Sequence, residues 1–227
     1  MIKAIVFDLD DTLWPVAPVI LHAETTLHVW LAQHAPGIVA RYSIEDLRHA
    51  RQKMVSRDPR FAYDLWALRH ALLCDLMAEE SLPLGLADQA MQVFAHARNQ
   101  VDLYADVLPG LQQLQKRFVL ASLSNGFADL KAIGLASHFQ VSLAAHQFSC
   151  AKPDPRIFHE MLTRLACSAH EVMVVGDDLA IDVAGAQSVG MLGVWMNRRQ
   201  LKIEESALPN LVPDMIVESC EDLLLRL

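Results

Sequence analysis

Short apolar runs that end in polar residues recur along the chain and predict buried strands. The first run, Ile2–Phe7, is rich in β-branched residues and stops at Asp8. Later runs of this kind follow at Phe118–Leu123, Phe139–Leu143, Val172–Val175 and Leu192–Met196. After Pro109-Gly110, helix-like stretches alternate with these runs, an order typical of a parallel sheet with helices on both faces. The pattern predicts a doubly wound α/β core.

The long segment between the first two predicted strands has helical periodicity and little strand signal. Apolar residues at positions 20, 23, 27, 30 and 31 share one helical face, and a second such face spans Phe61–Leu76. Pro36-Gly37 and Asp58-Pro59 punctuate the segment. We therefore predict a core formed by residues 1–14 and 106–227, with a helical module of residues 15–105 inserted after the first strand.

Composition and charge limit the classes of protein to consider. The chain has 227 residues, of which 53% are hydrophobic and 20% charged, so it can form a sizeable folded core. The formal net charge is -8, whereas a general nucleic-acid binder carries an excess of basic residues. An anionic substrate would need local positive charge, supplied by a metal ion or by a few placed basic side chains.

Cysteine usage and the N-terminal segment predict a cytoplasmic protein. The four cysteines show no Cys-x-x-Cys spacing, which favours reduced thiols over a zinc site or a redox pair. Acidic residues interrupt the first apolar run by position 8, unlike a signal peptide. No apolar run is long enough to cross a membrane. We expect no membrane partner and no nucleic-acid partner.

Polar residues follow four of the predicted strands. In open parallel sheets, ligands bind outside the carboxyl ends of the strands, so these residues are candidates for one site. They are Asp8, Asp10, Asp11 and Thr12 after the first strand, Ser124, Asn125 and Gly126 after the second, Lys152 after the third, and Asp177, Asp178 and Asp182 after the fourth.

The carboxylates suggest a metal ion and a nucleophile. Asp8 and Asp177 offer the hard oxygen ligands that Mg²⁺ prefers. Carboxylates held close together resist full ionisation unless a cation intervenes, and Lys152 can add positive charge to that of the metal. An aspartate can also attack phosphorus and form an aspartyl-phosphate.

The neighbouring polar residues complete a site for phosphoryl transfer. If strand alternation persists, Asp10 lies on the same side as Asp8 and can protonate a leaving alcohol, then take a proton from water. Ser124 and the amides around Asn125-Gly126 can donate hydrogen bonds to phosphoryl oxygens.

Each of these signals alone has a structural explanation. An acidic cluster after a strand can be a turn or a helix cap, and Asp177-Asp178 can cap a following helix. Ser124-Asn125-Gly126 alone reads as a turn, and Lys152 alone as a surface lysine. The order of the signals, each at a predicted strand end, favours the phosphoryl-transfer site.

The four motifs together resemble those of the haloacid dehalogenase superfamily of hydrolases. Asp8-Leu9-Asp10-Asp11-Thr12 fits the first motif, Ser124 the second, Lys152 the third, and Gly176-Asp177 with Asp182 the fourth. The resemblance implies a Rossmann-type core with an inserted C1 cap, which covers the site as a lid. It also implies a magnesium-dependent phosphatase.

The resemblance assigns roles to these positions as well. Asp8 would be the nucleophile and Asp10 the general acid and base. Mg²⁺ would be held by the Asp8 carboxylate, the Asp10 backbone carbonyl and Asp177. The residues that would bind phosphate are Thr12, Ser124, Asn125 and Lys152, and those that would support the pocket are Asp178 and Asp182.

A finer similarity concerns the substrate. Pro18–Leu21, Val175–Leu179 and Asp182–Ala186 resemble the bacterial branch that dephosphorylates flavin mononucleotide and 5-amino-6-(5-phospho-D-ribitylamino)uracil. This implies a small phosphorylated metabolite as substrate. The dehalogenases and phosphonatases of the superfamily usually lack an acid at this position, so Asp10 disfavours these two activities.

Three further questions stay open at the level of sequence. A phosphomutase of the same superfamily would also use the acid at Asp10. A non-enzymatic receiver-like module combines similar residues, although it has no large insertion after its first strand. Trp14 could line the substrate pocket or pack at the hinge of the cap.

Overall fold

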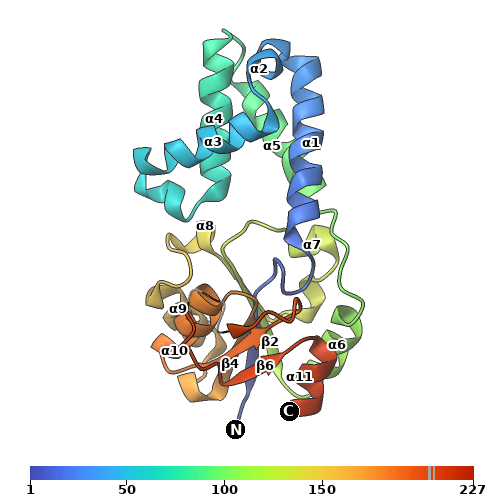
Figure 1. Ribbon diagram of the computed structural model, residues 1–227, viewed down its shortest axis with the longest axis vertical. Coiled ribbons are helices and arrows are strands. Elements are labelled where there is room, and N and C mark those ends of the chain that lie inside the picture. Colours follow the sequence, from blue (N-terminus) through green and yellow to red (C-terminus); the bar gives the residue numbers. More distant parts are fainter. Residues whose placement is uncertain (204–205, 207) are drawn as a thin grey trace. The chain divides into compact units, whose positions relative to one another are not determined.

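The computed structural model describes residues 1–203, 206 and 208–227, which divide into two compact units (Figure 1). One unit, the core, comprises Met1–Pro15, Asp102–Gly126 and Gly134–Leu227. The other, the helical unit, comprises Val16–Val101 and Phe127–Ile133. The helical insertion predicted from the sequence, residues 15–105, does not include the short segment Phe127–Ile133, which follows the second strand of the core.

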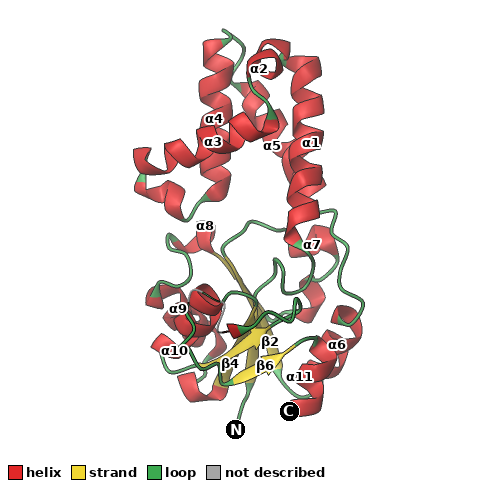
Figure 2. Ribbon diagram, in the orientation of Figure 1, coloured by secondary structure: helices red, strands yellow, loops and turns green. Residues whose placement is uncertain are grey.

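Within the described residues, the core contains one parallel sheet of six strands (Figure 2). The strands are β1 (Ala4–Phe7), β2 (Val119–Ser124), β3 (Val141–Ala144), β4 (Val172–Gly176), β5 (Leu192–Met196) and β6 (Met215–Val217), in the order β3-β2-β1-β4-β5-β6. β1 and β4 are buried at every position, as expected for central parallel strands covered on both faces. The predicted doubly wound α/β fold is confirmed.

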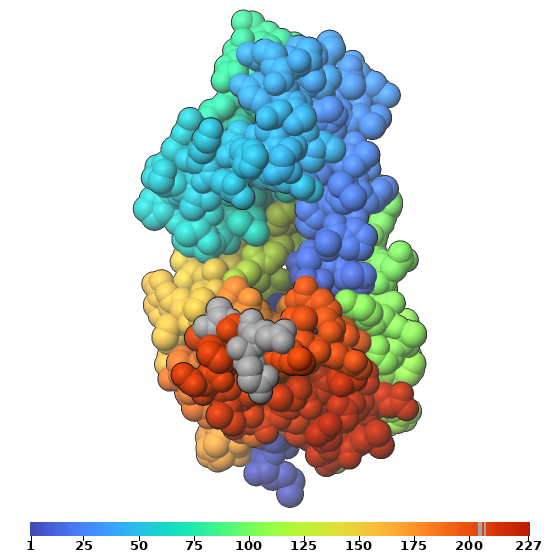
Figure 3. All heavy atoms as spheres, viewed as in Figure 1, coloured from blue at the N-terminus to red at the C-terminus, as the bar shows by residue number. Residues whose placement is uncertain are grey.

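Helices of the core pack their apolar residues against the sheet. Ile157, Phe158 and Met161 of α9 are buried in one cluster with β1, β2 and β4 residues. Figure 3 shows that the C-terminal segments of this unit, coloured orange to red, lie at the surface of the face drawn. The helices are α6 (Val107–Leu114), α8 (Ala145–Phe148), α9 (Pro155–Leu165), α10 (Gly185–Ser188) and α11 (Cys220–Arg226), with a π-helix at Leu179–Ala184 and 3₁₀ turns at Ala136–His138 and Ala169–Glu171.

The helical unit has a core of its own. The predicted face of residues 20–31 is confirmed, because Ala23, Leu27 and Leu31 of α1 are buried and α1 packs along α5. Ser43 begins α3 in a reciprocal capping box with Asp46. The helices are α1 (Val16–His34), α2 (Pro36–Arg41), α3 (Ile44–Met54), α4 (Leu65–Glu79), α5 (Gly85–Arg98) and α7 (Leu130–Ile133), with 3₁₀ turns at Val55–Arg57 and Pro59–Ala62.

The helices of the described residues are too short or too polar for a membrane span. None of them combines sufficient length with sufficient apolar character to cross a bilayer.

Candidate active site

The strand order brings the predicted site residues to one edge of the sheet. Asp8 directly follows β1, Ser124 ends β2, and Asp177 directly follows β4. Because β2 and β4 are the two neighbours of β1, their carboxyl ends lie on either side of Asp8. The order of the strands also reverses at β1, because β2 and β3 lie on one side of it and β4 lies on the other. Open parallel sheets bind ligands at such a reversal.

A buried lysine joins two of the carboxylates. Lys152 Nζ lies 2.6 Å from Asp8 Oδ1 and 2.6 Å from Asp182 Oδ1. Only 4% of Lys152, 8% of Asp8 and 1% of Asp182 is exposed, so solvent screens these charges weakly. One amino group thus contacts two carboxyl groups.

Three carboxylates converge closely enough to hold a metal ion. Asp8, Asp177 and Asp182 each offer an oxygen atom, and these atoms lie within 4.8 Å of one another. Gly176 permits this approach, since a Cβ atom at that position would lie 2.2 Å from Asp182 Oδ2. Hard oxygen donors in such a group fit Mg²⁺.

The electrostatics of the group also fit a cation. Burial raises the pKa of Asp8 to about 8, with a further rise from Asp182, although Lys152 opposes this shift. Burial and the carboxylates of Asp182, Asp11 and Asp178 raise the pKa of Asp177 to about 7. Full ionisation of these carboxyl groups would place more negative charge here than Lys152 balances, and a divalent ion would offset that charge.

Asn125 and Ser124 have defined partners within the core. Asn125 Oδ1 accepts a hydrogen bond from the Lys152 amide at 2.8 Å, and Asn125 Nδ2 donates to the Lys152 carbonyl at 2.9 Å. Ser124 Oγ accepts from the Gly126 amide at 2.9 Å. The side chain of Asn125 thus holds the backbone of the lysine, while Ser124 shapes the loop that follows β2.

The remaining predicted residues lie in different surroundings. The hydroxyl of Thr12 is buried without a hydrogen-bond partner among the described residues. Asp178 caps the π-helix, since its carboxylate accepts from the amides of Ala180 and Ile181. The Asp10 carboxylate accepts a hydrogen bond of 2.8 Å from the Trp14 indole.

Arg198 contacts the loop after β1 and was not among the predicted site residues. Its Nε donates to the Thr12 carbonyl at 2.7 Å, and its two Nη atoms lie 3.0 and 3.1 Å from the carboxylate oxygens of Asp106. The guanidinium also lies over the Tyr104 ring, 4.0 Å from its centre. Arg198 comes two residues after β5, and this position near the carboxyl end of a strand is the signal in the sequence that points to it.

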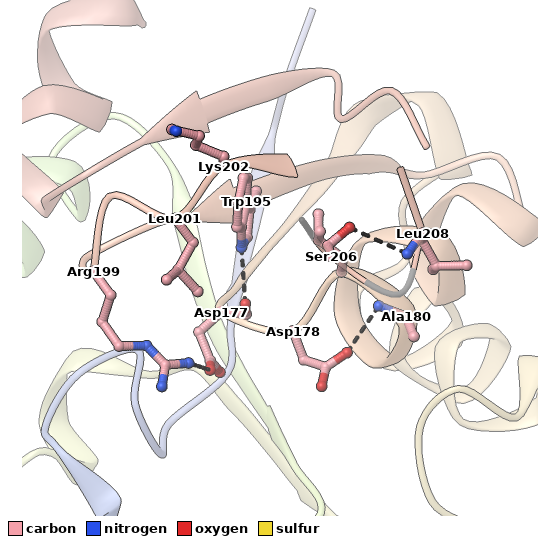
Figure 4. Close-up of a pocket in the computed structure, with 10 residues that line it drawn as sticks. Asp177, Asp178, Ala180, Trp195, Arg199, Leu201, Lys202, Ser206 and Leu208 are labelled. Carbon is pink, nitrogen blue, oxygen red and sulfur yellow. Dashed lines mark hydrogen bonds and ion pairs between the residues drawn. The ribbon is translucent and has the colours of Figure 1, made fainter. Parts of the chain in front are cut away.

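A pocket of about 380 Å³ borders Asp177 on the side of β5 (Figure 4). The Trp195 indole donates to the Asp177 carbonyl at 2.9 Å, and Arg199 Nη2 lies 3.9 Å from Asp177 Oδ2. Apolar walls from Leu179 and Leu201 complete this part of the pocket. It offers both apolar surface and positive charge beside the acidic group.

Comparison with known proteins assigns the chain to a family. Residues 2–190 match the haloacid dehalogenase-like hydrolases. The 5-amino-6-(5-phospho-D-ribitylamino)uracil phosphatase YigB of Escherichia coli (strain K12) is 32% identical over 200 residues, which cover 86% of this chain and 83% of that protein. The glyceraldehyde 3-phosphate phosphatase of Methanopyrus kandleri is 29% identical over 234 residues, which cover 99% and 96%. The chain belongs to the haloacid dehalogenase-like hydrolase family.

Solved structures agree on the fold. A 2-haloacid dehalogenase from Pseudomonas syringae pv. Tomato DC3000 superposes with a TM-score of 0.92 at 36% identity, covering 100% of this chain and 99% of that chain. The HAD-hydrolase YfnB from Bacillus subtilis, solved with bound magnesium, superposes with a TM-score of 0.67 at 18% identity, covering 100% and 99%, and supports the fold alone. Within the family, the chain is a phosphatase, that is, a phosphoric monoester hydrolase.

Proposed function

We propose that this phosphatase hydrolyses monoesters of small phosphorylated metabolites through a phosphoryl group carried on Asp8. The observation that carries the proposal is the buried Lys152 between Asp8 and Asp182, with Asp177 within metal-binding distance of both carboxylates. A nucleophilic carboxylate needs nearby positive charge to approach an anionic phosphate, and this arrangement supplies it.

The reaction would proceed in two displacements. In the first, an Asp8 oxygen attacks phosphorus, the ester P–O bond breaks, and the leaving alkoxide takes a proton from the Asp10 carboxyl. In the second, a water oxygen attacks the aspartyl-phosphate and Asp10 accepts a proton from that water. The bond between Asp8 and phosphorus then breaks, which releases inorganic phosphate and restores both aspartates.

Other side chains would bind the phosphoryl group and the metal. Ser124, Thr12, Lys152 and the amides near Asn125 are the groups we assign to the phosphoryl oxygens. Mg²⁺ would be held by the carboxylates of Asp8 and Asp177 and the Asp10 carbonyl; when bound, it neutralises charge on the phosphoryl oxygens. Asp182 pairs with Lys152 and would hold that lysine in place.

Magnesium should stabilise the protein more at pH 8 than at pH 5.5. The raised pKa values of Asp8, about 8, and Asp177, about 7, mean that the neutral acids are favoured in the metal-free fold. The two protonated carboxyl groups therefore stabilise the metal-free fold fully below about pH 4, and this stabilisation is lost as the pH rises through 7 and 8. Mg²⁺ favours the ionised forms and offsets that loss. Thermal unfolding with Mg²⁺ and with EDTA measures the difference.

Asp177→Asn is the matched variant for this measurement. Removal of one carboxylate should reduce the magnesium-dependent rise in melting temperature at pH 8 and abolish most of the activity that Mg²⁺ restores after chelation. Equal stabilisation at the two pH values, or full activity in exhaustively chelated protein, would contradict the metal assignment.

Asp10→Asn should slow the hydrolysis of alkyl phosphates by about 10²–10⁴-fold, the range for loss of a general acid. The effect on p-nitrophenyl phosphate should be much smaller, because its leaving group needs little protonation. Steady-state rates on both esters with one enzyme preparation give the comparison. Equal losses on the two esters would assign Asp10 to organising the metal or the fold instead.

The first substrates to test are flavin mononucleotide and 5-amino-6-(5-phospho-D-ribitylamino)uracil. The proposal is supported by the sequence similarity to that bacterial branch and by the relative YigB. A screen for phosphate release should include both compounds beside sugar phosphates and glyceraldehyde 3-phosphate. Turnover of another ester with none on the first two would reject this choice of substrate. Formation of an isomeric ester without free phosphate would indicate a phosphomutase.

Dehalogenation is a second candidate activity, favoured by the structural similarity to the Pseudomonas syringae protein. A halide ion leaves without a proton, so a dehalogenase has no task for an acid at Asp10. We therefore expect phosphate release from esters and no halide release from 2-chloropropionate under the same conditions. Halide release without phosphate release from any ester would reverse the assignment.

The helical insertion is proposed as the part that selects the substrate. We assign residues 15–105 to a C1 cap. The core groups that bind phosphate would recognise every phosphate ester alike, so discrimination between esters is left to the cap. Replacement of this segment by that of a related phosphatase should change the preferred substrate and preserve hydrolysis of p-nitrophenyl phosphate. A folded chimera with the original order of substrates would place specificity in the core loops.

A further inference from the structure

We propose that Trp14 is a positioning residue that fixes the carboxylate of Asp10 for proton transfer, an inference that rests on the proposed function. The indole Nε1 of Trp14 donates a hydrogen bond of 2.8 Å to Asp10 Oδ1. Trp14 is entirely buried, with 0% exposure. It is therefore neither exposed to a substrate pocket nor available to solvent, and its donor is held in a fixed direction.

The loop that carries both residues folds back on itself. The Asp11 amide donates to the Trp14 carbonyl at 2.8 Å, and the Leu13 amide donates to the Leu9 carbonyl at 2.8 Å. Asp11 adopts a positive φ of 57°, which turns the chain between Asp10 and Trp14. The tight turn brings the indole of residue 14 back to the carboxylate of residue 10.

Two long-range contacts fix the loop at its far end. Arg198 donates to the Thr12 carbonyl at 2.7 Å, and the Tyr104 amide donates to the Leu13 carbonyl at 3.1 Å. Arg198 is itself held by both carboxylate oxygens of Asp106. Displacement of the loop backbone next to Trp14 would therefore require disruption of contacts from two other segments of the core.

The hydrogen bond also favours one oxygen of Asp10 as the carrier of the acid proton. An indole N–H can only donate, so Asp10 Oδ1 must accept, whether or not the carboxyl group is ionised. A carbonyl oxygen accepts more strongly than a hydroxyl oxygen, so this bond favours the neutral acid with its proton on Oδ2, the oxygen that would deliver it to the leaving group. The indole restrains rotation of the carboxyl group, and its loss would leave fewer encounters with the geometry for proton transfer.

The test is Trp14→Phe, which retains an aromatic ring and removes the N–H donor. We expect the turnover of an alkyl phosphate to fall by about 10-fold or more relative to that of p-nitrophenyl phosphate. The ratio of the two rates is measured in one preparation, so a smaller folded fraction would not change it. Trp30→Phe is the control, because Trp30 stacks on His34 within α1 and should leave the ratio unaltered.

A double-mutant cycle and an NMR measurement separate positioning from packing. In the Asp10→Asn background, Trp14→Phe should cause no further change in the ratio, because the group that it positions is gone. The four tryptophans give four indole N–H signals, and the Trp14 signal is the one missing from Trp14→Phe. Asp10→Asn should shift this signal, since it replaces the carboxyl acceptor of the indole with an amide group.

The outcomes distinguish this inference from the proposed function. If the unmodified enzyme hydrolyses both esters and Trp14→Phe keeps its ratio, the positioning role is wrong and the phosphatase mechanism stands. An indole signal that does not respond to Asp10→Asn would also overturn the inference. If the unmodified enzyme releases phosphate from neither ester, the proposed function fails, and the role of Trp14 fails with it.

Discussion

Asp8→Asn should lower phosphate release by at least about 10⁴-fold, the scale expected when a catalytic nucleophile is removed. An amide cannot replace the attacking carboxylate, so no aspartyl-phosphate can form. The fold should survive, because Lys152 keeps its partner Asp182 at 2.6 Å and asparagine matches aspartate in size. Since burial raises the pKa of Asp8, loss of its charge should not destabilise the metal-free protein.

Turnover assays, circular dichroism and mass spectrometry together test this prediction. Asp75→Asn is the matched control, since Asp75 is half-exposed and pairs with Arg57 in the helical unit. A covalent phosphoryl group should be found on the peptide that contains Asp8 in the unmodified enzyme and not in the variant. Substantial multiple turnover by sequence-verified Asp8→Asn would exclude Asp8 as the nucleophile.

The central strands of the sheet could be predicted from the sequence, whereas the prediction was inexact or absent for the two edge strands. β1 and β4 are buried at every position, so their apolar runs are unbroken in the sequence. β3 begins at Val141 and not at Phe139, whose ring packs edge-on against Phe7. β6 was not predicted, because this edge strand has three residues and leaves Ile216 40% exposed.

The site divides along similar lines. Asp8 directly follows β1, whereas Lys152 comes after α8 and Asp182 lies within the π-helix that follows β4. Their meeting was predicted because all three come after parallel strands, whose carboxyl ends share one edge of the sheet. The contact between Arg198 and Thr12 joins residues 186 positions apart and leaves no local pattern in the sequence. The bond from Trp14 to Asp10 depends on a turn at Asp11, a residue without the glycine that usually marks such a conformation.

Glu24→Gln should destabilise the helical unit by about 3–5 kcal/mol, the range for removal of one partner from a buried ion pair. Glu24 on α1 is 4% exposed and lies 2.6 Å from Arg48, 2.5 Å from Arg51 and 3.7 Å from Arg69. It is the carboxylate that these three guanidinium groups share. Such a loss is a large part of the stability of a typical domain, about 5–15 kcal/mol.

Arg69 explains why the loss should be large. Its guanidinium lies 3.6 Å above the Phe94 ring, and its Nε and Nη1 atoms are buried without hydrogen-bond partners among the described residues. Burial and the neighbouring Arg51 lower the pKa of Arg69 to about 9, with Glu24 opposing the shift. Without Glu24, this buried positive charge would face Arg51 and Arg48 with no anion to balance it.

Urea denaturation followed by circular dichroism measures the loss, with Glu45→Gln as the control. Glu45 also pairs with Arg48, at 3.1 Å, but 60% of its side chain is exposed, so its removal should have a small effect. Arg69→Met added to Glu24→Gln should recover part of the stability, because it removes the unbalanced charge and keeps an apolar side chain against Phe94. Equal losses for Glu24→Gln and Glu45→Gln would show that the buried carboxylate does not stabilise the three arginines. No recovery with Arg69→Met would instead indicate that the loss arises from Arg48 and Arg51, which bond directly to Glu24.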